Sequence, residues 1–192
     1  NGLAESIEPK KTNAFIVGFV GRLDIYTKGL DLILKAFKGF LSACPDAQLW
    51  IVGDGPQRPV LEKMIHEMAL DGQVTLWGSK FGQEKDKLIQ KMTIFLHPSR
   101  NEGMPASVLE AANFGVPCVV SKATNIGKYI EQYQAGICID NESSTQLELA
   151  IDRLHETWKL DHLLPYQLGA KQMVAQGFDW AVIVNELDKL YK

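Results

Sequence analysis

Two glutamates and two cations stand in the stretches of this sequence that could carry chemistry. Glu102 and Glu110 are eight positions apart in EGMPASVLE, and Arg22 and Lys28 lie in GRLDIYTKG. Paired carboxylates suit either the cleavage of a glycosidic bond or hydrogen bonds to the hydroxyl groups of one ligand. A planar Arg fork and a Lys ammonium suit a diphosphate. On spacing alone, all four could equally be ordinary charges on a solvated surface.

A helix expected over residues 106–114 separates the roles of the two glutamates. Pro105 suits the first turn of that helix, where its missing N–H costs nothing, and Gly115 suits the position after its end. Glu110 then lies about one and a half turns inside the helix, while Glu102 lies in the loop before it. The two carboxylates therefore do not share a helical face, and the helix N-terminus between them can face an anion.

Short apolar runs alternate with helical patterns along most of the chain. The expected strands are Ala14–Val20, Gln48–Val52, Gln73–Trp77, Ile94–His97, Pro117–Val120 and Gly136–Ile139. Helices are expected over residues 30–44, 60–68, 84–91, 106–114, 127–133, 146–158, 162–176 and 180–191. Strands covered on both faces and separated by helices predict an α/β, Rossmann-like, three-layer αβα domain with a parallel sheet of about six strands.

Ligands of such sheets bind at the carboxyl ends of the strands, so the loops there are the candidate sites. Besides the stretches above, these loops include GDGP at residues 53–56 and WGSK at residues 77–80. Their glycines permit either a tight turn or a close approach to a ligand, and the sequence leaves both open. His97 ends the fourth expected strand, where a lone histidine is more often packed or solvated than catalytic.

Composition limits the remaining function classes. A net charge of −3 gives no reason to expect nucleic acid or an anionic membrane as the main partner. No apolar run is long enough to span a membrane, and no signal peptide is expected. Cys44, Cys118 and Cys138 form no CxxC or Cys/His metal spacing and are expected to be reduced, buried thiols in a cytoplasmic setting. We expect no metal site and no nucleophile–His–acid set.

The remaining histidines are expected to be surface residues, because His66, His155 and His162 lie in amphipathic helical patterns.

Taken together, the loops resemble one family. GRLDIYTKG resembles the GRLxxxKG loop of GT4-type glycosyltransferases, which are retaining, nucleotide-sugar-dependent enzymes of the GT-B fold. EGMPASVLEAANFGVPCVVS resembles their E-x7-E segment with the following helix and strand, and LWIVGDGP and VTLWGS resemble the second and third strand–loop segments. The resemblance covers roughly residues 14–140, in order and with matching gaps.

The resemblance implies a role for each matching residue. Arg22 and Lys28 would hold the donor diphosphate, and Glu102 would face the hydroxyls of the donor sugar. Glu110 would accept hydrogen bonds from the ribose, while backbone near Ala106 and Ser107 would contact the distal phosphate. Backbone near Ser79 and Lys80 would edge the base. Arg22, Lys28 and Glu102 are the expected catalytic residues; the expected donor-binding set is Gly21, Arg22, Lys28, Gly53, Gly55, Ser79, Lys80, Glu102, Gly103, Met104, Pro105, Ala106, Ser107 and Glu110.

The resemblance also implies a domain organisation and a substrate class. Residues 14–176 would be the donor-binding, C-terminal half of a GT-B enzyme, after a linker remnant at residues 1–13. Residues 177–192 would form a helix returning to a missing N-terminal domain, which would hold an acceptor glycan or lipid-linked glycan. The donor would be a UDP-, GDP- or ADP-sugar, bound without metal or cofactor. The expected setting is polysaccharide, capsule or lipopolysaccharide synthesis, with the full-length protein at the inner face of the membrane.

Two departures from the family pattern qualify these roles. Met104-Pro105 stands where Phe-Gly is commoner, and Pro105 removes a backbone N–H near the expected sugar. Gly127-Lys128 stands where many relatives carry Pro-Glu, so a carboxylate role is not carried over there.

Other functions remain open at this point. A sugar-nucleotide epimerase shares the two-domain architecture, and a flavodoxin-like interaction module shares the sheet. A receiver-type module needs clustered acids after the first and third strands, where this chain has Arg22 and Gly78. Glycoside hydrolysis ranks lower, because it does not require the two cations Arg22 and Lys28.

Overall fold

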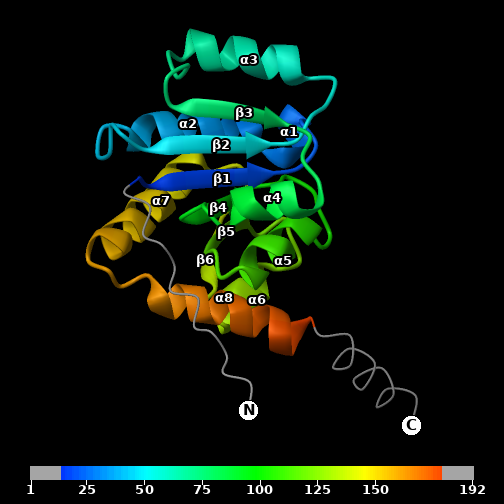
Figure 1. Cartoon of the computed structure of the whole chain (residues 1–192), viewed down its shortest axis with the longest axis vertical. Helices are drawn as coiled ribbons and strands as arrows, with labels where there is room; N and C mark the ends of the chain where they lie inside the picture. Colours follow the sequence, from blue (N-terminus) through cyan, green and yellow to red (C-terminus); the bar gives the residue numbers. More distant parts are fainter. Residues whose placement is uncertain (1–13, 179–192) are drawn as a thin grey trace.

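A parallel sheet forms the centre of the chain. This computed structural model describes residues 14–178 of the 192. Their strands are β1 (Ile16–Val20), β2 (Gln48–Val52), β3 (Val74–Gly78), β4 (Ile94–His97), β5 (Cys118–Ser121) and β6 (Gly136–Ile139). The order across the sheet is β3-β2-β1-β4-β5-β6, and each neighbouring pair is parallel (Figure 1). The expected parallel sheet of about six strands is confirmed, with its carboxyl ends at one edge.

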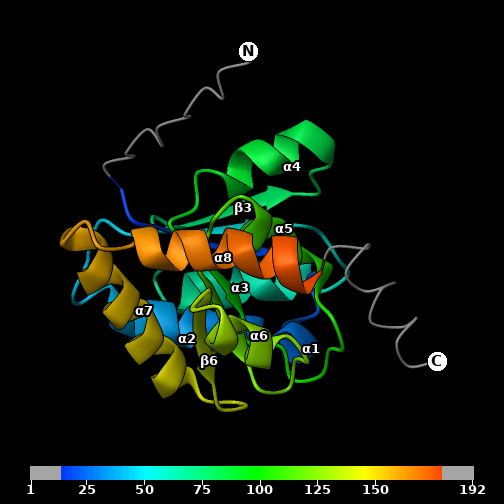
Figure 2. The same ribbon diagram turned by 90° about the horizontal axis from the view of Figure 1, so that it is seen from below.

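Helices cover both faces of the sheet and complete the three layers (Figures 1 and 2). They are α1 (Ile25–Lys28), α2 (Leu30–Phe40), α3 (Arg58–Glu67), α4 (Gly82–Ile89), α5 (Ala106–Asn113), α6 (Gly127–Gln132), α7 (Ser144–Lys159) and α8 (Leu164–Gly177). One apolar cluster joins α2, α3 and α7 to the sheet, and a second joins α4, α5, α6 and α8 to it. Strand β1 serves both, since Val17 and Phe19 lie in the first cluster and Ile16 and Val20 in the second.

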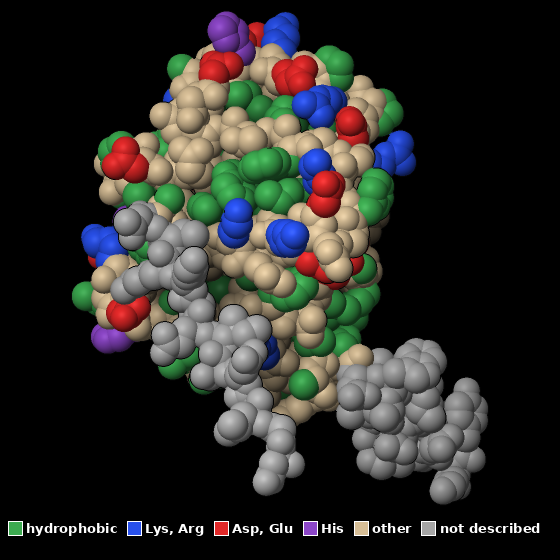
Figure 3. Space-filling model, viewed as in Figure 1, with side chains coloured by type: hydrophobic (Ala, Val, Ile, Leu, Met, Phe, Trp, Pro, Cys, Tyr) green, Lys and Arg blue, Asp and Glu red, His purple; other side chains and the backbone are tan. Residues whose placement is uncertain are grey.

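The edge strand β3 departs from the expected burial on both faces. Its side chains are only partly buried, and Trp77 is 37% exposed. Trp50 of β2 packs beside it, with ring centroids 5.2 Å apart. Figure 3 shows apolar side chains gathered over this part of the sheet, bordered by Lys and Arg. A strand at the sheet edge has a neighbour on one side only, and burial falls accordingly.

Two local expectations about the chain near the site are corrected. The stretch GRLDIYTKG contains a one-turn helix, α1, because the side chain of Asp24 accepts a hydrogen bond from the Thr27 N–H at 3.1 Å. Gly29 then ends α1 in the left-handed conformation, with φ 70°. Pro105 is the N-cap of α5 rather than a residue of its first turn. Gly115, with φ 76°, follows the end of α5 as expected.

His155 is buried, which corrects the expectation of a surface residue. It is 4% exposed on α7, where its ring packs edge-on to Phe15 at 4.9 Å and Phe40 at 5.1 Å between centroids. It follows Leu154 on the buried stripe of α7, so the apolar face of this helix is wider than the sequence pattern indicated. Burial lowers the pKa of the His155 imidazole. His66 and His162 are exposed, as expected.

Two further expectations concern the cysteines and the membrane. All three cysteines are free thiols, but only Cys118 is buried, and Cys44 and Cys138 are partly exposed. Across residues 14–178, the helices are too short or too polar to cross a bilayer. The linker expected at residues 1–13 and the helix expected at residues 180–191 lie outside the described residues.

Glycines let the loops after β1 and β2 touch backbone to backbone. Gly53 has φ 139°, and a Cβ there would lie 1.9 Å from the carbonyl oxygen of Gly21. A Cβ at Gly55 would lie 2.9 Å from the carbonyl oxygen of Leu23. These distances explain the glycines of GDGP by packing, and they bring the two loops together at the edge of the sheet.

Replacing Gly53 by Ala tests this contact. The added methyl group meets fixed backbone at a residue that also requires positive φ, so we expect the free energy of unfolding to fall by at least about 2 kcal/mol. That corresponds to a drop in Tm of roughly 4–8 °C for a chain of this size. Gly72→Ala is the control, because no atom lies within 4 Å of a Cβ there. Equal thermal denaturation curves for the two variants would contradict the packing role of Gly53.

Candidate functional site

The candidate site lies where the loops after β1, β2, β3 and β4 meet at the carboxyl edge of the sheet (Figure 1). Because β1 and β4 are neighbours, the loops that carry the expected cations and the expected carboxylate are brought side by side. Gly29 marks the contact between them, since a Cβ there would lie 2.3 Å from the carbonyl oxygen of Pro98. The strand order thus assembles residues from distant parts of the sequence.

The two expected cations occupy different positions in the first loop. Lys28 is the last residue of α1, and its side chain is 20% exposed. Arg22 is exposed and lines a hollow of about 130 Å³ together with Leu23, Asp24, Pro56 and Gln57. The side chain of Gln57 accepts a hydrogen bond from the Ile25 N–H at 2.6 Å, which ties the start of α1 to the second loop.

Lys28, Glu102 and His97 form one hydrogen-bonded cluster. Lys28 Nζ lies 2.8 Å from Glu102 Oε2, and His97 Nε2 lies 2.5 Å from the same oxygen. Residues 14–178 provide no hydrogen bond to the other oxygen, Oε1, which leaves it able to accept from a ligand hydroxyl. The carboxylate of Glu102 is therefore anchored through Oε2, and Oε1 remains available to a ligand.

The cluster favours the ionised form of Glu102. The hydrogen bond from His97 is the largest cause and, with Lys28, outweighs burial, which acts in the opposite direction; the pKa of Glu102 falls to about 2. An ionised carboxylate only accepts, so His97 Nε2 carries the proton between the two groups. His97 Nδ1 is buried and has no hydrogen-bond partner within the described residues.

His97, which was expected to be packed or solvated rather than catalytic, is a residue of the site. It is 1% exposed, and its ring lies almost parallel to those of Phe19 and Phe95, at 8° and 7°. The packed alternative considered for a histidine at a strand end is thus correct, but one nitrogen reaches the site. Its position at the carboxyl end of a central strand was the available signal.

The two glutamates of EGMPASVLE do not form a pair. Glu102 adds a short parallel bridge to Thr124, whereas Glu110 is in α5 and binds Lys85 of α4 at 2.7 Å. Each carboxylate therefore has its own lysine. The start of α5 lies between the two glutamates in the sequence. The first backbone N–H groups of this helix, including those of Ala106 and Ser107, have no carbonyl acceptor within the helix and can donate to an anion.

The remaining expected donor-binding residues lie on the same edge. Ser79 is exposed after β3, and Lys80 Nζ contacts Glu84 at 3.4 Å. Gly103 and Met104 are exposed, and the carbonyl oxygen of Gly103 accepts a hydrogen bond from the Asn125 N–H at 2.9 Å. This bond joins the loop after β4 to the loop after β5.

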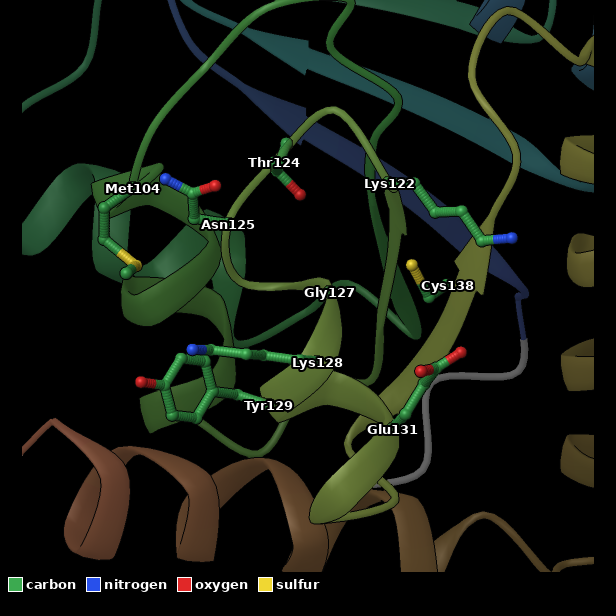
Figure 4. Close-up of a pocket in the computed structure, with 9 residues that line it drawn as sticks. All are labelled: Met104, Lys122, Thr124, Asn125, Gly127, Lys128, Tyr129, Glu131 and Cys138. Atoms are coloured by element: carbon green, nitrogen blue, oxygen red, sulfur yellow. The ribbon is translucent and has the colours of Figure 1, made fainter.

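An open hollow of about 430 Å³ lies one loop further along the edge, beside Met104 (Figure 4). It is formed mainly by the loop after β5, by α6 and by β6. Its lining residues are Met104, Lys122, Thr124, Asn125, Gly127, Lys128, Tyr129, Glu131 and Cys138. In Figure 4 the side chain of Lys128 extends over the ring of Tyr129, and Lys122 is held by Asp140 at 2.6 Å. The loop after β5 is one of the strand-end loops where a ligand is expected, but Met104 is the one described lining residue in the expected binding set.

Metal-ligating side chains are not clustered in the described part of the chain. Among residues 14–178, no group of three or more His, Cys, Asp or Glu side chains has the arrangement to hold a metal ion.

The Glu102 cluster predicts a particular response to acid. A pKa lower in the folded chain than the ordinary 4.5 means that Glu102 contributes stability above pH 4.5 and loses it as the pH falls toward 2. Between pH 6 and pH 3, we expect wild type to lose about 1–2 kcal/mol more than Glu102→Gln, after allowing for solvent screening. Urea denaturation at both pH values measures this, with Glu67→Gln as an exposed control. Equal losses in wild type and Glu102→Gln would contradict the cluster.

Comparisons with known proteins agree with this geometry. A family model described as Glycosyl transferases group 1 matches residues 4–167. Alpha-D-kanosaminyltransferase of Streptomyces kanamyceticus is 30% identical, over 90% of this chain and 46% of its own length. An uncharacterized glycosyltransferase of Methanocaldococcus jannaschii is 28% identical, over 91% of this chain and 44% of its own length. The chain thus spans less than half the length of these relatives.

A solved structure with the same fold is the C-terminal domain of a glycosyl transferase group 1 family protein, LpcC, from Francisella tularensis. It has a TM-score of 0.76 at 22% identity and covers 86% of this chain and 87% of its own. Anabaena Alr3699/HepE, solved in complex with UDP-glucose, has a TM-score of 0.78 at 23% identity, over 93% of this chain and 49% of its own. The structures confirm the Rossmann-like fold of GT-B glycosyltransferases, and the match over residues 4–167 shows that this chain belongs to the glycosyl transferases group 1 family.

Proposed function

We propose that this chain is the donor-binding half of a retaining glycosyltransferase, and that it holds a nucleoside-diphosphate sugar along the carboxyl edge of its sheet. The observation that carries the proposal is the contact between Lys28 and Glu102 at 2.8 Å. In a nucleotide sugar, the distal phosphate is bonded directly to the sugar. A cation for the phosphate and a carboxylate for the sugar hydroxyls must therefore lie next to each other, as Lys28 and Glu102 do.

Neighbouring loops supply the other contacts of this proposal. Arg22 joins Lys28 on the diphosphate, and the first N–H groups of α5 add a partial positive charge. Glu110 accepts hydrogen bonds from the ribose once Lys85 shifts from it, and Ser79 and Lys80 edge the base. Gly21, Gly53, Gly55, Gly103, Met104 and Pro105 form the backbone walls; Pro105 has no N–H to offer the sugar.

Donor binding exchanges partners within the Glu102 cluster. Lys28 turns from Glu102 to the diphosphate, whose two phosphates each carry one negative charge and compete for it. Glu102 keeps its hydrogen bond from His97 through Oε2 and accepts from the sugar through Oε1. The protein thus uses the same two side chains to stabilise its own loops and to recognise the ligand.

The proposed chemistry follows from where charge develops. As the glycosidic bond breaks, negative charge grows on the departing diphosphate, and Arg22, Lys28 and the start of α5 are fixed there to stabilise it without a metal ion. The acceptor hydroxyl attacks the anomeric carbon on the face that the diphosphate leaves and gives its proton to the departing phosphate oxygen, which retains the anomeric configuration and needs no protein nucleophile. Glu102 holds the sugar during this step.

The rest of the proposal concerns the whole protein. Relatives are more than twice as long as the part matched here, so we assign acceptor binding to the remainder and expect no transfer by this chain alone. Membership of a glycosyl transferase family favours transfer over the epimerase and interaction-module alternatives. We further propose a role in polysaccharide, capsule or lipopolysaccharide synthesis at the inner face of the cell membrane.

Calorimetry in the presence of EDTA tests the assignment of the cations. UDP, GDP and ADP are titrated first to identify the base that this chain prefers. UDP is among them because the Anabaena structure holds UDP-glucose. Arg22→Ala and Lys28→Ala should each weaken the preferred nucleoside diphosphate about tenfold and its nucleoside less than twofold, since only the diphosphate meets the cations. Lys38→Ala is the control, because Lys38 is an exposed cation in the last turn of α2, at the opposite edge of the sheet.

Three results would each count against a part of this function. Absence of binding by all three nucleoside diphosphates at millimolar concentration would refute donor binding. Equal losses for the diphosphate and the nucleoside in both cation variants would refute the assigned roles. Binding that is lost in EDTA and restored by added Mg²⁺ would refute only the metal-independence of the proposal.

A further inference from the structure

We propose that Arg100 is a positioning residue that fixes the distance between Lys28 and Glu102 without touching the ligand. The inference rests on the donor-binding function proposed above and names a residue outside the expected binding set. Arg100 stands two positions before Glu102 and binds the segment that carries Lys28. Its side chain is only 9% exposed, although it is charged.

The first part of this link is an ion pair with α2. Arg100 Nη1 and Nη2 donate to the two carboxylate oxygens of Asp31, each at 2.8 Å. Such two-point pairing fixes the orientation of the guanidinium as well as its distance. Asp31 lies in the first turn of α2. It follows Leu30, the first residue of α2, and Gly29, the glycine that separates α2 from α1. The pair therefore ties the loop after β4 to the start of α2.

The second part binds α1 itself. Arg100 Nη1 also donates to the carbonyl oxygen of Tyr26 at 2.6 Å, and its guanidinium lies 4.3 Å from the centre of the Tyr26 ring. The Arg100 N–H donates to the carbonyl oxygen of Thr27 at 2.9 Å, and the Ser99 hydroxyl donates to the same oxygen at 2.8 Å. Thr27, the residue before Lys28, is thus held by two hydrogen bonds from Ser99 and Arg100, which lie shortly before Glu102.

These contacts hold the backbone segment that carries Lys28 at a fixed distance from the segment that carries Glu102. Two long side chains on independent loops would lose much of their pairing energy to conformational entropy. Here the loops are joined on one side by Arg100 and packed at Gly29 against Pro98. His97 holds Glu102 from within the sheet. Arg100 therefore pre-organises the position of the cation, which lowers the ordering cost of diphosphate binding.

Lysine cannot perform this task. The arrangement uses two N–H groups of Nη1 and one of Nη2 at once, in the plane of the guanidinium. A lysine ammonium provides one point of charge and cannot reach both Asp31 oxygens and the Tyr26 carbonyl in that geometry. Loss of the planar fork should therefore release α1 even when the positive charge remains.

The test compares a nucleoside diphosphate with its nucleoside in Arg100→Met, Arg100→Lys and Asp31→Asn. UDP and uridine are the probes, or the pair with the base that wild type prefers. We expect each variant to bind UDP about five- to twentyfold more weakly and uridine within twofold of wild type. Arg100→Lys should not rescue the loss. The double variant Arg100→Met/Asp31→Asn should be no weaker than either single one, because the two residues act as a unit.

Arg153→Met is the matched control, since Arg153 is an exposed residue of α7. It should leave both affinities unchanged. Should Arg100→Met fail to fold, as judged by its thermal transition, Arg100→Lys and Asp31→Asn provide the same comparison. A folded set of variants with the wild-type ratio of UDP to uridine affinity would overturn the proposal. So would an equal loss of both ligands, which indicates general support of the fold.

A ligand-free readout separates this proposal from the proposed function. The pKa of the Glu102 carboxyl, followed by ¹³C NMR, should be higher in Arg100→Met than in wild type, because Lys28 is no longer held beside it. It should be unchanged in Arg153→Met. If wild type binds no nucleotide, the donor-binding function fails while this measurement still decides on Arg100. An unchanged Glu102 pKa in Arg100→Met would overturn the positioning role.

Discussion

The ion pair between Lys28 and Glu102 is the contact on which the rest of the site depends. It joins the segment after β1 to the segment after β4 and brings together the two kinds of group that a sugar phosphate needs. An isolated ion pair near the surface contributes little, because solvent screens it and both side chains must be ordered. This one is supported, since His97 shares the carboxylate and backbone contacts hold both loops.

The parallel sheet makes this contact possible. Its strand order puts β1 beside β4, so their carboxyl ends open side by side even though two other strands lie between them in the sequence. Glycines then remove the side chains that would keep the loops apart, at Gly53 against Gly21 and at Gly29 against Pro98. The apolar clusters on the two faces keep the strands rigid beneath the loops. Fold stability and site geometry are therefore linked through the same loops.

Much of the fold could be predicted from the sequence because its signals are local. Apolar runs such as IFLH and QLWIV give strands with the expected bounds, and Gly115 ends α5 as its conformational freedom suggests. Local signals also explain the misjudged details. A short helix inside GRLDIYTKG depends on a single side-chain cap, from Asp24, and the burial of edge strand β3 depends on what lies beside it.

The candidate site was only partly predictable, for a physical reason. The rule for parallel sheets indicated which loops to inspect, but not which side chains would pair across them. Arg100 and the buried His155 owe their roles to partners distant in the sequence, and a single sequence gives no direct signal of such contacts. His97 bonds to Glu102 only five positions away, but the path of the loop between them decides whether they meet. Likewise, the separate lysine partner of Glu110 became visible only when α4 was placed beside α5.

A crystal structure of this chain with its preferred nucleoside diphosphate, grown in EDTA, tests the central claim most directly. The account predicts the distal phosphate within about 2.7–2.9 Å of Lys28 Nζ, with that side chain turned away from Glu102. Glu102 should keep its contact with His97 and face the open space beyond the phosphate. A diphosphate bound away from Lys28, with the Lys28–Glu102 pair intact, would contradict the account.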